Sequence, residues 1–469
     1  MVIRIIDAVN EQAPAGAKKL FVKSYGCQMN VYDGFRMAEL LAPLGYTLAD
    51  SADGADVVLL NTCHIREKAD DKLFSDLGRF RRAAKEDAIL AVGGCTGQAL
   101  GAKVMEAAPS VSVVFGPQTY HRLPALIEKV QQGRIARAQG HKNAPIRAVD
   151  VDFPELEKFD RLPTPGAYGP TAFVTIQEGC DKFCTYCVVP YTRGAEISRP
   201  WQHVVAECEQ LAAQGVREVT LLGQNVNAYE NDGITLAGLC EKVGEIDGIA
   251  RIRFTTSHPN NTGDDLIEAF ATNPKLMPYF HLPVQAGSNR ILQAMNRNHT
   301  VESYLATLEK VRAARPDIAI SGDFIVGFPG ETEEDFAATL AVAHQVQYVG
   351  AFSFAYSPRP GTPAAELPGQ IDEITKKERL AALNVVLDDS LAAFCKKFDG
   401  HTVEVLVEGH GGRAEKFGQP QLRGRSLHNL PVNFTFGDAD PLSLMGQLVN
   451  VRVTHTTAKA LNGVLIQGL

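Results

Sequence analysis

The sequence lacks any run of about eighteen or more apolar residues, and this excludes a helix that spans a membrane. Residues 1–19 lack both a continuous apolar core and a small-residue cleavage site, so we expect no secretory signal and a cytoplasmic location. An excess of basic residues is also missing, because the formal net charge is −8. That charge argues against nonspecific adhesion to nucleic acid, although it leaves room for a local basic patch.

The chain is long and apolar enough for several cores. Its 469 residues suffice for about three domains, and 45% of them are hydrophobic. Nine cysteines in a chain that is not exported are typical of metal ligands and reduced thiols rather than of disulfides. The cysteine content therefore favours a metal-binding function.

Three cysteines stand close together in the middle of the chain. Cys180, Cys184 and Cys187 form a CxxxCxxC run just after the apolar, strand-like segment TAFVTI. Their soft sulfur atoms suit an iron–sulfur cluster or zinc. A structural zinc site needs four protein ligands, and His203 or Cys208 would have to supply the fourth. Three ligands favour a [4Fe–4S] cluster with one open iron, with zinc and plain core packing as the alternatives.

The region 18–134 has the pattern of a parallel α/β sheet domain. Apolar strands are expected at 20–26, 56–62, 88–94 and 111–116, with helical patterns between them. Nearly continuous apolar strands that alternate with helices indicate a parallel sheet covered on both faces.

Each of the first three expected strands runs directly into a cysteine, namely Cys27, Cys63 and Cys95. The carboxyl ends of parallel strands lie at one edge of the sheet, where open α/β folds bind their ligands. Glycines beside Cys27 and Cys95 would let the backbone approach a bulky cluster. The pattern predicts a second three-cysteine cluster site, and the alternative is three unrelated buried cysteines.

A proline-punctuated linker is expected at 135–165, followed by a second α/β domain over 166–397. Strands are expected at 173–177, 218–223, 251–256, 279–284, 318–327 and 350–356, and six such units indicate a partial (β/α)6 barrel. Polar residues that follow these strands, or lie within one in the case of Asp323, are candidates for holding a cofactor or substrate: Gln224, Asn225, Gln285 and Asp323. Ordinary turn chemistry is the alternative for them, and we prefer it for Thr332 and Glu333, which read as the start of a capped helix.

The last region, 398–469, changes to short strands with glycine-rich turns, which predicts a small five-stranded barrel of the OB type. We expect a loop at 413–425 to carry four basic residues that could contact phosphates: Arg413, Lys416, Arg423 and Arg425. A solvated loop without a partner is the alternative.

These motifs resemble a known family. The CxxxCxxC run with Tyr186 before its last cysteine resembles the radical S-adenosylmethionine (SAM) enzymes, and EGCDKFCTYCVVPYTRG resembles the methylthiotransferases among them. The stretches SYGCQMNVYD, NTCHIREKA and VGGCTGQ resemble the N-terminal domain of that family, and the C-terminal region resembles the RNA-binding TRAM domain.

The resemblance implies two [4Fe–4S] clusters, one on each cysteine trio, with SAM bound at the open iron of the Cys180 site and cleaved reductively to a radical. It implies SAM contacts near Tyr186, Gln224, Asn225 and Asp323, and substrate contacts near Gln285 and the four basic residues. We assign no general acid or base, since the radical supplies the reactivity that side chains lack.

The implied reaction adds a methylthio group to carbon-2 of N(6)-isopentenyladenosine at position 37 of tRNA. The implied partners are the anticodon stem-loop and an electron donor such as flavodoxin or ferredoxin. Sister enzymes of this family act on threonylcarbamoyl-adenosine in tRNA or on an aspartate of a ribosomal protein, and these reactions are the alternatives. A function of a different class, a noncatalytic RNA-binding metalloprotein, would show no SAM turnover.

Overall fold

The computed structural model describes residues 16–63, 69–154, 157–411 and 419–466. The chain forms two compact units that interleave along the sequence. The N-terminal unit comprises residues up to 168 together with 177–181 and 187–199, and the C-terminal unit comprises 169–176, 182–186 and everything from 200 onward. The CxxxCxxC run is therefore divided between them.

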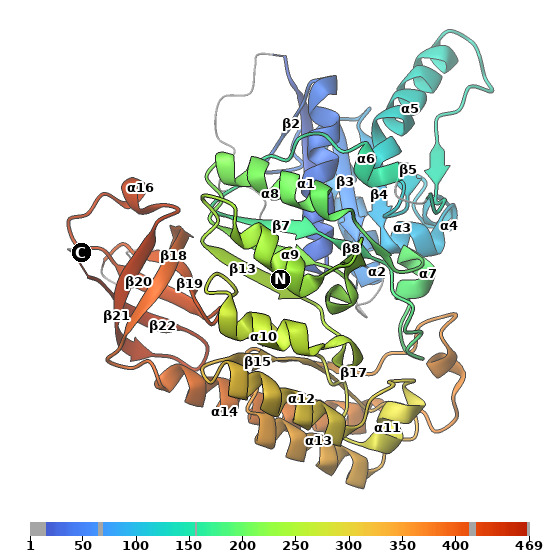
Figure 1. Ribbon diagram of the computed structural model, residues 1–469. Coiled ribbons are helices and arrows are strands. Elements are labelled where there is room, and N and C mark those ends of the chain that lie inside the picture. The colour runs from blue at the N-terminus through green and yellow to red at the C-terminus, as the bar shows by residue number, and fades with distance from the viewer. Residues whose placement is uncertain (1–15, 64–68, 155–156, 412–418, 467–469) are drawn as a thin grey trace. The chain divides into compact units, whose positions relative to one another are not determined.

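A six-stranded, fully parallel sheet is the centre of the N-terminal unit (Figure 1). Its spatial order is β2-β1-β3-β4-β5-β6, and the strands are β1 Lys18–Ser24, β2 Tyr46–Leu48, β3 Val57–Thr62, β4 Ile89–Gly94, β5 Val111–Phe115 and β6 Ala148–Asp150. The parallel α/β prediction is confirmed, with the short edge strands β2 and β6 in addition. The strand order reverses between β1 and β3, which is the position where open α/β folds bind ligands.

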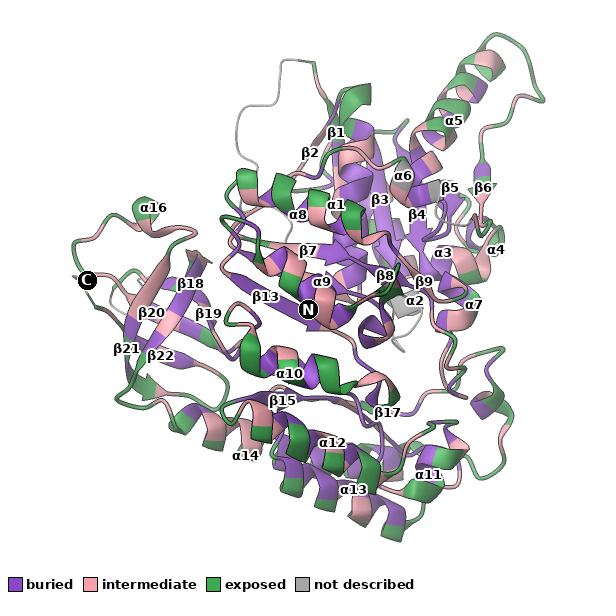
Figure 2. Ribbon diagram, in the orientation of Figure 1, coloured by how far each residue is buried: buried purple, intermediate pink, exposed green. Residues whose placement is uncertain are grey.

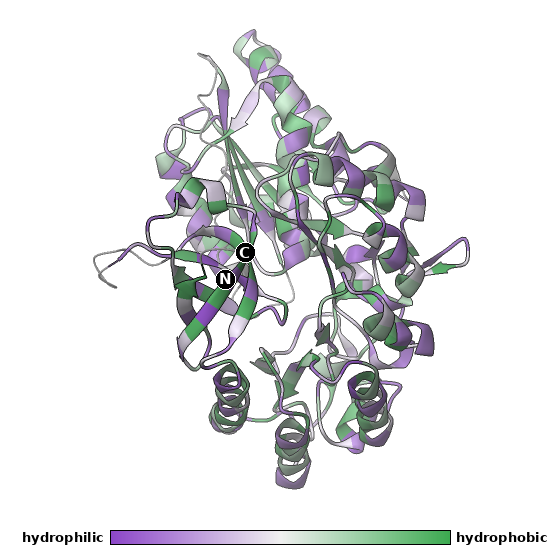
Figure 3. Cartoon of the chain, turned by 60° about the vertical axis from the view of Figure 1, so that its left-hand side comes forward, coloured by the Kyte–Doolittle hydropathy of each residue, from purple (hydrophilic) through white to green (hydrophobic). Residues whose placement is uncertain are grey.

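Two apolar cores cover the two faces of this sheet. On one face, α1 and α5 pack on side chains such as Leu59 and Phe115, and on the other face α2 and α4 pack on side chains such as Leu60 and Val92. Alternate strand residues supply the two cores, so β3 and β4 are buried along their whole length (Figure 2). Hydrophobic and hydrophilic residues along the chain are shown in Figure 3. The helices of this unit are α1 Gln28–Leu41, α2 Ala69–Ala83, α3 Cys95–Leu100, α4 Lys103–Ala107, α5 Leu123–Ala138, α6 Glu157–Asp160 and α7 Val189–Arg193.

A small arm, formed by residues 177–181 and 187–199, completes the N-terminal unit. Strand β8 Gln177–Glu178 pairs antiparallel with β9 Ile197–Ser198, and α7 lies between them in sequence. The Gln118 side chain donates to the carbonyl of Arg193 at 2.9 Å, which fixes the end of α7 within the unit. The arm therefore carries Cys180 and Cys187 as part of the N-terminal unit.

Parallel strand pairs build the partial barrel of the C-terminal unit. The strands are β7 Thr171–Thr175, β10 Glu218–Leu222 and β13 Arg251–Thr255 in one sheet, β14 Tyr279–His281 with β15 Ala319–Ser321, and β16 Asp323–Val326 with β17 Phe352–Ala355. The helices that follow them are α8 Trp201–Ala213, α9 Leu236–Gly244, α10 Asp264–Thr272, α11 Asn289–Ala294, α12 Val301–Ala314, α13 Glu333–Val346 and α14 Glu373–Lys396. Six strand regions of the predicted partial (β/α)6 barrel are thus present, the fifth of them split into β15 and β16.

A closed five-stranded barrel follows α14, as predicted. Its order is β18-β19-β20-β22-β21, with bounds β18 Thr402–His410, β19 Leu422–Ser426, β20 Pro431–Thr435, β21 Leu448–Thr456 and β22 Leu461–Leu465. Two buried arginines of β13 join it to the (β/α) strands. Arg251 donates to the carbonyl of Arg425 at 2.9 Å, and Arg253 donates to the carbonyl of Ser426 at 2.9 Å.

The domain limits expected from sequence can be compared with these units. Residues 135–165, predicted as a linker, include the end of α5, strand β6 and helix α6, all within the N-terminal unit. The C-terminal barrel belongs to the same compact unit as the (β/α) strands. In the part of the chain that the structure describes, no helix has the length and apolar character needed to span a membrane.

Candidate cofactor sites

The three N-terminal cysteines follow the ends of three neighbouring strands. Cys27 is the N-cap of α1 just after β1, Cys63 directly follows β3, and Cys95 is the first residue of α3 after β4. Their predicted position at one edge of the sheet is confirmed, and Cys27 and Cys63 lie where the strand order reverses. Their role as cluster ligands stays a prediction.

Two asparagines hold the backbone around Cys27. The Asn30 side chain donates to the carbonyl of Tyr25 at 2.6 Å, and the Asn61 side chain donates to the carbonyl of Asn30 at 2.7 Å. Both asparagines are buried, so these bonds are not open to competition from water. The turn that presents Cys27 is therefore fixed to strand β3.

Glycine is required beside the thiols. Gly26 has a φ of +100°, and a Cβ there would lie 2.3 Å from Cys63 Cβ and 3.0 Å from its Sγ. Gly94 has a φ of +85°, and a Cβ there would lie 2.4 Å from the carbonyl of Thr62. No other residue type fits either position without a shift, so the glycines keep the cysteines close to one another.

The electrostatics of this trio favour a thiolate at Cys27. A hydrogen bond with Cys63 lowers the pKa of Cys27 to about 5, against the opposing effect of burial and with the help of the Arg193 charge. Burial raises the pKa of Cys95, and the Arg193 charge opposes that rise. The site thus combines three thiols with one guanidinium.

Arg193 reaches this site from α7 and is only 3% exposed. Its Nη2 donates to Asp33 Oδ2 at 2.8 Å and to Asn30 Oδ1 at 3.2 Å, and its Nη1 donates to Glu178 Oε1 at 3.2 Å. Lys158 forms a second buried ion pair with Glu178. Sequence reasoning missed Arg193, because its partners on α1 lie 160 and 163 positions away and no spacing rule connects them.

The donor set of the N-terminal trio fits an iron–sulfur cluster. Among the described residues, no three His, Cys, Asp or Glu side chains are grouped so that they could hold one ion. Three thiols around a glycine-lined turn, with a buried cation beside them, are suited to a larger anionic thiolate cluster.

The CxxxCxxC cysteines are each fixed within their own unit. In the N-terminal unit, Cys180 N donates to the carbonyl of Gly194 at 3.3 Å, and Cys187 Sγ accepts from Val189 N at 3.5 Å. In the C-terminal unit, the buried Cys184 Sγ accepts a hydrogen bond from Arg297 Nη1 at 3.7 Å.

Arg297 is the cation beside Cys184, and sequence reasoning missed it as well. Its Nη2 donates to the carbonyl of Pro283 at 2.7 Å, which holds the guanidinium in place. Burial lowers the pKa of His299 to about 4 and lowers the pKa of His258 further, with the Arg297 charge acting in the same direction. Both imidazoles are therefore neutral near pH 7, and Arg297 places a positive charge next to Cys184.

The structure brings some of the predicted polar residues together. Gln285 has a φ of +76°, and its backbone pairs with β16, donating to the carbonyl of Asp323 at 2.9 Å. Asp323 Oδ2 lies 3.6 Å from His281 Nε2. Gln224 and Asn225 follow β10 in a different sheet, where buried Asn225 contacts Asn261 at 3.3 Å. Tyr186 packs against the apolar cluster around Ala286 and Ile291.

One face of β16 and β17 turns towards the inside of the barrel. Ser353 hydrogen-bonds Asn384 on α14, so its strand neighbours Phe352 and Phe354 point the other way. These rings are 53% and 38% exposed, and their register partners are Asp323 and Ile325. The Phe352 ring lies 6.4 Å from that of His281. Exposed aromatic rings thus stand beside polar groups on this inner face.

The predicted phosphate-contacting loop needs correction. Arg423 and Arg425 lie in strand β19 rather than in a loop, and they alternate with buried Gly424 so that both point outward. Arg425 Nε lies 3.7 Å from Glu408 Oε1, which offsets part of its charge. Arg413 and Lys416 lie outside the described residues.

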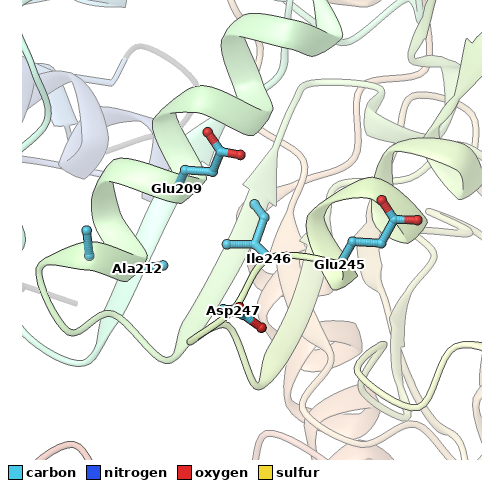
Figure 4. A pocket seen from close by; sticks show the side chains of 6 residues that line it. Glu209, Ala212, Glu245, Ile246 and Asp247 are labelled. Carbon is cyan, nitrogen blue, oxygen red and sulfur yellow. The ribbon is translucent and has the colours of Figure 1, made fainter.

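A shallow hollow of about 440 Å³ lies between α8 and the end of α9 (Figure 4). Half of its lining residues are acidic, namely Glu209, Glu245 and Asp247, and the others are Ala212, Ala213 and Ile246. Carboxylates of one sign around an open hollow do not suit an anionic ligand, and the cysteine trios do not line it.

Comparisons with known proteins agree with this geometry. The model of the Radical SAM superfamily matches residues 174–343, and that of the uncharacterized protein family UPF0004 matches residues 19–116. Proteins named tRNA-2-methylthio-N(6)-dimethylallyladenosine synthase are similar over almost their whole length. The one from Cereibacter sphaeroides is 52% identical over 95% of this chain and 98% of its own. The one from Maricaulis maris is 52% identical over 96% of this chain and 97% of its own. The one from a Jannaschia species is 50% identical over 98% of this chain and 97% of its own.

Among solved structures, the radical S-adenosylmethionine methyltransferase TsrM from Kitasatospora setae, with cobalamin and a [4Fe–4S] cluster bound, has a similar fold. The TM-score is 0.54 at 14% identity, over 74% of each chain. At that identity the likeness concerns the fold alone.

Proposed function

The chain belongs to the tRNA-2-methylthio-N(6)-dimethylallyladenosine synthases of the radical SAM superfamily, and on this premise we propose that it adds a methylthio group to carbon-2 of N(6)-dimethylallyladenosine in tRNA. The similarity of about 52% over nearly the full length of the Cereibacter sphaeroides relative carries the proposal. The chain is then an enzyme, a transferase, rather than a noncatalytic RNA-binding protein. The modified base is position 37, next to the anticodon.

The cofactors are SAM and iron–sulfur clusters. Cys180, Cys184 and Cys187 hold one [4Fe–4S] cluster, and the second, auxiliary cluster is held by the trio of Cys27, Cys63 and Cys95. The clusters supply electron transfer and a site for sulfur, which side chains lack. The geometry of the N-terminal trio supports the second site, because Gly26 and Gly94 keep the three strand ends open to close approach.

One arginine guanidinium lies beside each of the two cysteine trios. Arg297 donates to Cys184 Sγ, and buried Arg193 stands beside Cys27 and Cys95. Each arginine is fixed by other partners, the carbonyl of Pro283 for Arg297 and the carboxylate of Asp33 for Arg193. A fixed positive charge favours the anionic thiolates that bind iron, since no reorganisation is needed when they form. A flavodoxin or ferredoxin is the expected source of electrons.

The substrate base fits the inner face of β16 and β17. Phe352 and Phe354 offer exposed rings for stacking on an adenine and for contact with its dimethylallyl group. His281 and Asp323 lie beside these rings and offer polar groups for the base edge. An anticodon-loop base can be splayed into such a site at lower cost than one from a duplex.

The C-terminal barrel is the expected RNA-binding module. Arg251 and Arg253 hold it rigidly against the (β/α) strands, so it can position tRNA relative to the inner face. Exposed Arg423 on β19 is one candidate for contact with a phosphate.

The test is mass spectrometry of tRNA nucleosides from a strain that lacks this gene. We expect the methylthio group to disappear while the dimethylallyl group remains, and a plasmid copy to restore it. Unchanged tRNA with an unmodified ribosomal aspartate would contradict the proposal, as would loss of a methylthio group from threonylcarbamoyl-adenosine alone.

A further inference from the structure

Arg193 connects two stretches of chain that carry different cysteines. It is the last residue of α7, six positions after Cys187, on the arm that also carries Cys180. Its side chain leaves that arm and reaches Asn30 and Asp33 on α1, the helix that Cys27 caps. The guanidinium thereby spans from the CxxxCxxC segment to the auxiliary site.

The charges around Arg193 show which cation faces the thiols. Arg193 and Lys158 are balanced by Asp33 and Glu178, and all four side chains are buried. Lys158 is directed at Glu178 and at the carbonyl of Pro117. Arg193 ends helix α7, which packs against α3, the helix that begins at Cys95, and its guanidinium bonds Asn30 and Asp33 on the helix that Cys27 caps. Any negative charge added at Cys27, Cys63 and Cys95 therefore interacts most directly with the guanidinium of Arg193.

We propose that Arg193 is a positioning residue of the auxiliary site, whose fixed charge raises the reduction potential of the cluster bound by Cys27, Cys63 and Cys95. The potential of an iron–sulfur cluster depends on the net charge nearby, on hydrogen bonds to its sulfurs and on burial. Arg193 supplies charge and N–H donors in a buried place, where both act strongly. This inference rests on the proposed function, since it requires that the second cluster exists.

The test uses the full-length chain with Cys180, Cys184 and Cys187 replaced by alanine, so that the auxiliary trio alone can bind a cluster. After anaerobic reconstitution with iron and sulfide, the midpoint potential is measured by a redox titration followed by electron paramagnetic resonance. Arg193→Gln removes the charge, and Arg193→Lys keeps it. Arg36→Gln is the matched control, because Arg36 is also buried on α1 but pairs with Glu39 and the carbonyl of Pro163.

We expect Arg193→Gln to shift the potential to more negative values, Arg193→Lys to stay near the parent, and Arg36→Gln to leave it unchanged. An iron-loaded Arg193→Gln protein with the parental potential would overturn this inference and leave the proposed function unaffected. If Arg193→Gln binds no iron, Arg193→Lys decides: parental iron content and potential support the inference, and loss of iron overturns it. A parent that binds no cluster would overturn the second cluster of the proposed function and this inference with it.

Discussion

Arg193 Nη2 donates a hydrogen bond to Asp33 Oδ2 at 2.8 Å, and both side chains are buried. This pair joins the arm that carries Cys180 and Cys187 to helix α1, directly after Cys27. Part of the CxxxCxxC motif is thus built into the same unit as Cys27, Cys63 and Cys95. The pair is consequently the contact whose loss should disturb both the stability and the chemistry of this unit.

Breaking the buried pair should destabilise the protein strongly. Asp33→Ala leaves Arg193 buried with one carboxylate fewer, and we expect a loss of about 3–5 kcal/mol in the free energy of unfolding. Asp388→Ala, which removes the exposed partner of Lys459, should cost at most about 1 kcal/mol. Denaturant titration of both variants provides the comparison, and equal losses would refute the importance of the Arg193–Asp33 pair.

The two cysteine trios should be separable by mutation. Cys184→Ala should abolish formation of 5′-deoxyadenosine from SAM, because the cluster that binds SAM loses a ligand. Cys63→Ala should retain some 5′-deoxyadenosine formation but lose methylthio transfer. Chromatography of the SAM products and of digested tRNA measures both. If well-folded Cys63→Ala and Cys184→Ala lost both reactions alike, the division of labour would be wrong.

Loss of an exposed ring on the inner face of β16 and β17 should weaken the reaction with the RNA substrate and leave SAM cleavage unchanged. Phe354→Ala removes a stacking partner worth about 1–3 kcal/mol, so kcat/KM for a dimethylallylated anticodon stem-loop should fall by roughly 5-fold to 150-fold. SAM cleavage without RNA should stay unchanged. Ile374→Ala is the control, since Ile374 is an even more exposed apolar residue, on α14. An unaltered kcat/KM for Phe354→Ala would exclude this face as the base site.

The acid sensitivity of helix α13 should depend on Asp335. Burial would raise the pKa of this carboxyl, but hydrogen bonds from Arg290, Ser288 and Thr332 outweigh it and hold the pKa well below its usual range. A depressed folded-state pKa gives stability that is complete above the unfolded pKa of about 3.9 and is lost as the pH falls towards the folded one.

Asp335→Asn should therefore lower the free energy of unfolding by about 1–2 kcal/mol near pH 7, as expected for a lost helix cap. The difference from the parent should shrink below about pH 4. Thermal unfolding across that pH range measures it. A difference that grew as the pH fell would contradict the assigned role of the carboxylate.

Local patterns predicted much of the fold. The apolar strands β3, β4 and β5 were predictable because burial on both faces leaves continuous hydrophobic runs. The expected helix start at Thr332 is confirmed, with a capping box between Thr332 and Asp335. Strand β19 was missed because its central buried position is Gly424, where a Cβ would lie 2.0 Å from the carbonyl oxygen of Leu406 and no side chain fits. Its pattern of hydrophobic residues is hidden as a result.

The site was predictable where strand ends carry cysteines and was not where the contacts are long-range. Cys27, Cys63 and Cys95 could be placed at one sheet edge, since parallel strands fix that edge. Arg193 and Arg297 could not be singled out, because their partners lie 160 and 113 positions away in sequence. Only the folded chain brings these guanidiniums to the thiols.

We propose above all that the chain holds two [4Fe–4S] clusters on two cysteine trios. The most direct test is iron and sulfide analysis with Mössbauer spectroscopy of anaerobically reconstituted protein. We expect about eight irons per chain in the parent, and about four after replacement of either trio by alanine. About four irons in the parent, all lost when Cys180, Cys184 and Cys187 are replaced, would contradict the claim.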